Sequence, residues 1–113
     1  MKKSAHERLK VEIACFESAR KDKRDDLCLL HLGRAHIISQ SMNSFEHLSI
    51  HFIMFCYACR KRDPKEVLGQ LLRLLVTLPG HLFGKVPLGN TGWTTMKLTD
   101  ERPIPDDLKD LFS

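Results

Sequence analysis

Long apolar runs are the first feature that this 113-residue sequence lacks. The apolar stretch 48–59 is too short to cross a bilayer, and the stretch 67–83 is interrupted by Gln70, Arg73 and Pro79. No apolar segment follows the basic residues at the N-terminus, so we expect no cleaved secretion signal. Four cysteines without such a signal favour reduced thiols. We therefore expect a cytoplasmic protein without a disulfide framework.

The sequence also lacks a concentrated run of positive charge, which would indicate nucleic-acid binding. The formal net charge is +4, and acidic residues lie within or beside the basic runs 20–24 and 60–65. Neither run has the interleaved aromatic residues on which bases stack. Both runs are expected at one end of the folded chain, where they could face an acidic partner or phosphates. Solvated turns are the better interpretation, so we expect neither a nucleic acid nor a membrane as a partner.

Recognisable catalytic signatures are scarce. The segment 87–92 lacks the lysine and the strand-to-helix context of a phosphate-binding loop, although it could cover a site or receive a partner. Cys56 and Cys59 form a single Cys-x-x-Cys pair inside an expected helix, so we predict buried structural cysteines there, as at Cys15 and Cys28. No serine, cysteine or aspartate forms a recognisable nucleophile–base pair. An enzyme is therefore less expected than a binding protein.

What the sequence does contain is four segments with apolar residues at helical spacing. They predict helices over residues 4–21, 26–40, 44–62 and 65–78. The connections are short, so neighbouring helices should run antiparallel. At 113 residues, with 42% hydrophobic and 28% charged residues, the chain suits one soluble domain over residues 1–113. We predict an all-α fold, either an antiparallel four-helix bundle or helix pairs that pack as in helical repeats.

The end of the chain has a different character. Pro79 and Gly80 are expected to end the fourth helix. From residue 84 onward the sequence is rich in glycine and proline, which predicts an extended tail docked on the helices, with Trp93, Leu98 and Ile104 as anchors and a last turn of helix near its end. The core expected from helical spacing consists of Ile13, Phe16, Leu30, Ile37, Phe52, Phe55, Leu71 and Leu75.

Three histidines stand out as candidate functional residues. Residues 41–44 have turn chemistry, so the second and third helices should fold back on each other. His47 and His51 stand one helical turn apart on one face. Positions equidistant from the turn lie side by side in such a hairpin, which brings His36 level with His51. The pattern predicts three converging imidazoles.

Converging imidazoles are typical ligands for zinc, copper, nickel or iron. His6 or Glu12, from the first helix, could supply a fourth ligand, whereas His31 is rotated away from the cluster. The leading hypothesis is a small protein that binds a transition-metal ion through His36, His47 and His51. The alternative is a protein–protein interaction module whose histidines are structural and hydrogen-bonded to Ser39, Gln40 or the backbone. A metal-dependent enzyme is a third and weaker interpretation.

Several sequence blocks resemble one known family. Residues 31–40, His47, His51, the segment 62–74 and the Pro-Leu-Gly-Asn-Thr-Gly stretch 87–92 are similar, in this order, to the bacterial domain-of-unknown-function family 3703. The resemblance implies a small helical bacterial protein without a settled activity. The family commonly carries glutamate where this chain has Gly33. That glutamate would form a Glu-x-x-His pair with the histidine three residues later, as in carboxylate-bridged metal bundles.

Overall fold

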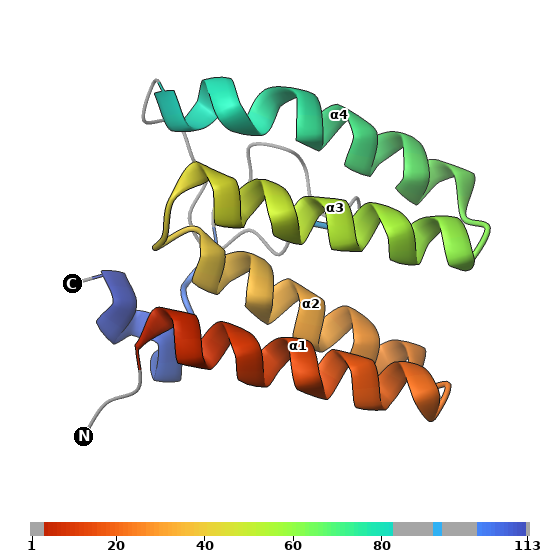
Figure 1. Ribbon diagram of the computed structural model, residues 1–113, viewed down its shortest axis with the longest axis horizontal. Helices are drawn as coiled ribbons and strands as arrows, with labels where there is room; N and C mark the ends of the chain where they lie inside the picture. The colour runs from red at the N-terminus through yellow and green to blue at the C-terminus, as the bar shows by residue number, and fades with distance from the viewer. Residues whose placement is uncertain (1–3, 83–91, 94–101, 113) are drawn as a thin grey trace.

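The computed structural model describes residues 4–82, 92–93 and 102–112, and the described residues contain helices but no strand. Figure 1 shows the four long helices lying side by side in chain order, with the terminal 3₁₀ helix near the start of the first. The predicted all-α fold is confirmed. The elements are α1 (Ala5–Lys21), α2 (Asp25–Ser39), α3 (Ser44–Arg60), α4 (Pro64–Leu82) and the 3₁₀ helix η1 (Asp106–Phe112).

The helices pack as two close antiparallel pairs. α1 packs along α2 and α3 packs along α4, whereas the contact between α2 and α3 is less extensive. α1 and α4 are not among the packed pairs of the described residues, although a closed bundle would bring them together. Of the two arrangements expected from the sequence, the structure therefore has the helix pairs.

Capping residues explain where α1, α3 and α4 begin. The Ser4 hydroxyl accepts a hydrogen bond from the backbone N–H of Glu7, and the Asn43 side chain accepts one from Glu46. Asp63 caps α4 in the same way, with Pro64 at the first helical position. These side chains satisfy backbone donors that have no partner inside the helix.

The buried core lies between the two helix pairs and includes Leu32, Ile38, Ile50 and Met54. Of the core residues expected from the sequence, Phe16 and Ile37 are buried, and Ile13 and Phe55 are half-buried. The prediction was wrong for four residues, whose exposed fractions are 52% for Leu30, 59% for Phe52, 45% for Leu71 and 69% for Leu75.

The error has a physical cause. α3 turns His47, His51 and Met54 inward, so Phe52 lies on the opposite face of that helix. α4 likewise turns polar residues inward and leucines outward. On α2, Cys28 and Leu32 occupy the inner face and leave Leu30 outside. Apolar spacing located the helices but did not identify their buried faces.

Two further expectations are corrected. α4 continues through Pro79 and Gly80 to Leu82, because proline has a φ angle suited to a helix and can lose one backbone hydrogen bond without ending it. Cys59 is exposed and Cys56 half-buried, because both lie away from the inner face of α3. All four cysteines are free.

The described parts of the tail pack on the helices. Trp93 is buried, and its indole N–H donates to the backbone carbonyl of Leu29 at 3.0 Å. Ile104 packs against the core, and Leu108 of η1 is buried. Trp93 and Ile104 thus agree with their predicted role as anchors, and η1 provides the predicted last helical turns. Leu98 lies outside the described residues, and docking of the whole tail stays a prediction.

Ion pairs hold η1 against the first helix pair. Arg8 donates to both carboxylate oxygens of Asp110 at 2.8 Å, and Arg34 is paired with Asp107. Pairing with Arg34 lowers the pKa of the Asp107 carboxyl. None of the described helices is both long enough and apolar enough to span a membrane.

Candidate metal centre

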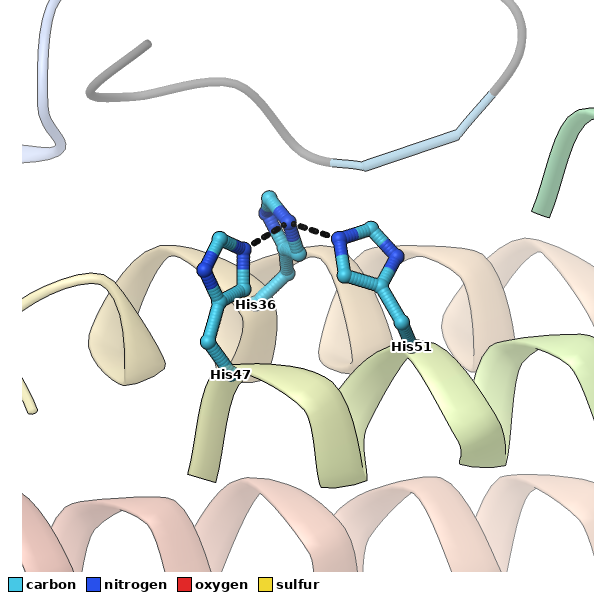
Figure 2. A group of neighbouring side chains, drawn as sticks. All are labelled: His36, His47 and His51. Atoms are coloured by element: carbon cyan, nitrogen blue, oxygen red, sulfur yellow. Dashed lines mark hydrogen bonds between the residues drawn. The ribbon is translucent and has the colours of Figure 1, made fainter. Parts of the chain in front are cut away.

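The histidine cluster forms where α2 and α3 fold back on each other. The Asn43 cap starts α3 immediately after the turn, which sets the register between His36 on α2 and the pair His47 and His51 on α3. All three side chains are buried, with exposed fractions of 3–4%. In Figure 2 the three rings point toward one another, one from behind and two from the front helix. The predicted convergence is confirmed.

The three Nε2 atoms face a common volume. His36 Nε2 lies 2.9 Å from His51 Nε2 and 2.9 Å from His47 Nε2. One ligand nitrogen from each residue can be chosen so that all three lie within 4.8 Å of one another. The ring centroids are 4.5 to 5.0 Å apart. Three imidazoles from two helices therefore present nitrogen atoms to one point.

Gln70 of α4 determines which nitrogen of His51 carries a proton. His51 Nδ1 lies 3.0 Å from Gln70 Oε1, an oxygen that can only accept, so Nδ1 is the donor. The amide is oriented by its other end, because Gln70 Nε2 donates to the backbone carbonyl of Gly92 at 2.7 Å and to Glu66 at 3.4 Å. Neutral His51 therefore carries its proton on Nδ1 and directs the lone pair of Nε2 into the cluster.

Burial keeps His51 neutral. Desolvation lowers the pKa of His51 to about 4, an effect that the hydrogen bond donated to Gln70 opposes and the nearby charge of Arg73 strengthens. A neutral imidazole with a free lone pair is the form that binds a metal ion. At neutral pH no proton has to leave His51 before its Nε2 can act as a ligand.

The segment of residues 92–93 closes the cluster on the side toward which the rings point (Figure 2). Gly92 has a φ angle of +85°, and a Cβ atom built there would lie 2.8 Å from Cδ2 of His36. Only glycine combines this backbone conformation with such a close approach to the ring. The carbonyls of Gly92 and Trp93 accept hydrogen bonds from Gln70 and Arg73 respectively, which ties the segment to α4.

Comparison with known proteins agrees with the blocks seen in the sequence. The sequence profile of a family described as proteins of unknown function, DUF3703, matches residues 3–112. The chain belongs to DUF3703. No curated protein and no solved structure gives a significant match.

The other candidate ligands of this DUF3703 chain lie away from the cluster. His6 is exposed on α1. Glu12 lies 2.7 Å from His31 Nδ1 and accepts a hydrogen bond from Arg34 at 2.7 Å. His31 is outside the cluster, as predicted. Among the described residues, the group of possible metal ligands consists of His36, His47 and His51.

The residues around the cluster of the DUF3703 chain were harder to foresee. Gly33 is buried one turn before His36, so no carboxylate enters from that position. Ser39 donates to the backbone carbonyl of His36 and not to its ring. From the sequence, the segment 87–92, which ends at Gly92, could cover a site, but no site role followed for Gln70. The available signal was the polar pair Glu66 and Gln70, spaced one turn apart within a leucine-rich segment.

Proposed function

We propose that this DUF3703 protein binds a transition-metal ion through the Nε2 atoms of His36, His47 and His51. The observation that carries the proposal is the convergence of three buried imidazole nitrogens from two helices on one point. A single buried histidine is commonly structural. Three that face one another, one of them with its lone pair directed inward by Gln70, form a donor set suited to a metal cation.

The geometry requires only a small adjustment to hold an ion. Zinc binds imidazole nitrogen at about 2.0–2.1 Å, so tetrahedral ligands lie roughly 3.3 Å apart. The two pairs at 2.9 Å would separate by a few tenths of an ångström, and His47 would approach His51. A neutral ring that carries its proton on Nε2 would change tautomer, losing that proton and taking one up at Nδ1, so that it binds the ion as a neutral imidazole. Small rotations of the side chains are sufficient for this change.

Imidazole ligands suit zinc, copper, nickel or iron, and the proposal extends to any of these ions. We propose a role in binding or handling the ion inside the cytoplasm. The four free cysteines are compatible with a reducing compartment. Gln70 would act as the outer partner of a metal ligand, a position in which a hydrogen bond fixes the ring orientation and tautomer.

Calorimetric titration of the metal-free protein, purified without a histidine tag, tests the proposal. We expect zinc, copper or nickel to bind at one site per chain with a dissociation constant below about 1 µM. His51→Ala should abolish this binding. His31→Ala is the matched control, because His31 lies on α2 beside Glu12 and outside the cluster. Absence of binding, or equal losses from the two substitutions, would contradict the proposal and favour structural histidines.

A further inference from the structure

α4 has its polar residues inside and its apolar residues outside. Glu66, Gln70 and Arg73 have exposed fractions of 9%, 0% and 6%, and they face α3 and the segment of residues 92–93. The opposite side of the helix carries exposed aliphatic side chains, which we call the leucine face. Its members are Leu68, Leu71, Leu72, Leu75 and Val76, with exposed fractions from 36% to 69%.

The spacing of the leucine face is that of a helix-packing seam. Relative to Leu68, the other members lie three, four, seven and eight residues further along, so together they form one stripe. Such a stripe normally packs against another helix. Among the packed helix pairs of the described residues, α4 has α3 as its single neighbour, and Figure 1 shows α4 at the edge of the row of helices. None of the described helices therefore packs against the leucine face.

The charge pattern narrows the choice of partner. Between Val67 and Val76 the one charged residue is Arg73, which is buried on the other side of α4. An acidic partner would find no exposed cation there. A helix that binds a membrane surface usually carries exposed lysine or arginine along its polar face, whereas the polar face of α4 is buried against α3 and the segment of residues 92–93. An uncharged, apolar helix face is the matching surface.

We propose that the leucine face of α4 pairs with the leucine face of a second copy of this chain about a two-fold axis. A second copy supplies an uncharged stripe of identical spacing. A two-fold axis lets the two identical stripes pack against each other, so that each contact occurs twice. The two α4 helices then lie in the middle of a continuous row of eight long helices, four from each chain. This inference is independent of metal binding.

The size of the surface suits a modest affinity. Five aliphatic side chains at roughly 100 Å² each bury about 500 Å² per copy, compared with about 800 Å² for a stable standard interface. A micromolar dimer is therefore expected.

Sedimentation equilibrium of the metal-free protein from about 1 to 200 µM tests the pairing. We expect the wild-type chain to be dimeric at the upper end. Leu75→Glu should weaken association at least about tenfold, because each copy would bring an unpaired carboxylate into the apolar contact. Val11→Glu is the control, since Val11 is 46% exposed on α1, away from the leucine face. Circular dichroism confirms folding, and Leu75→Gln replaces Leu75→Glu if the latter unfolds.

Three results would overturn the inference. One is a chain that stays monomeric over the whole concentration range. A monomer that co-sediments with phosphatidylcholine vesicles counts as this result. Another is a Val11→Glu variant that dissociates as readily as Leu75→Glu. A dimer that persists unchanged in Leu75→Glu would likewise place the interface elsewhere.

Discussion

At the scale of single residues, the amide of Gln70 joins the candidate metal centre to the segment that covers it. Its oxygen accepts the Nδ1 proton of His51, and its nitrogen donates to the carbonyl of Gly92. An amide is suited to this position because it is both donor and acceptor. A residue that could only accept, or that could make neither bond, would uncouple the imidazole from the backbone above it.

Replacement of Gln70 separates these two roles. Gln70→Leu removes the acceptor that fixes the His51 tautomer, and we expect the affinity for zinc to fall about 10- to 100-fold. Gln70→Glu keeps an acceptor at the same distance, so affinity should be largely retained even if the loss of the bond to Gly92 reduces stability. Calorimetry with zinc measures both effects. Lys65→Ala, exposed on α4, is the control; a Gln70→Leu variant with unchanged affinity would exclude the positioning role.

At the scale of helices, the sequence was sufficient for the elements and for the histidine cluster. Capping residues and apolar spacing located four helices, and the short turn before α3 set the register that brings His36 to His51. Both depend on interactions that are local in sequence. The buried faces could not be assigned in this way, because Phe52 and Leu75 have the same spacing as core residues and their exposure depends on how distant helices pack. Gly92 acquires its role only when the chain returns to α2.

The corrected face of α3 predicts unequal effects of two substitutions. Phe52→Ala should lower the free energy of unfolding by less than about 1 kcal/mol in the monomer, because the ring is 59% exposed. Met54→Ala removes a side chain that is 0% exposed and should cost about 2–5 kcal/mol. Urea unfolding at low protein concentration measures both. Similar losses would show that Phe52 is covered in solution.

At the scale of the whole molecule, a buried neutral histidine makes stability depend on pH. His51 has a pKa of about 4 in the folded chain and about 6.5 when exposed in the unfolded chain. Between these values the unfolded chain binds the proton and the folded chain does not. The contribution of His51 to the free energy of unfolding is therefore fully present above about pH 6.5, and it is lost as the pH drops toward 4.

The expected contribution of His51 is about 3 kcal/mol, lost between roughly pH 6.5 and 4. Urea unfolding of the metal-free protein in the presence of a chelator measures it at several pH values. His51→Gln cannot titrate, so its stability should vary less over this interval than that of the wild-type chain. Parallel pH profiles for the two proteins would show that His51 is not the group responsible.

Trp93 gives the molecule a built-in optical reporter. It is the single tryptophan of the chain, and it is buried. The centroid of its indole ring lies 6.1 Å from the centroid of the Tyr57 ring. The α2–α3 hairpin that holds the histidines is local in sequence, whereas Trp93 reaches Leu29 across 64 residues. Local contacts form faster than distant ones. In a refolding experiment, helix formation should therefore precede the change in tryptophan fluorescence, and that later change marks the moment at which the histidines are covered.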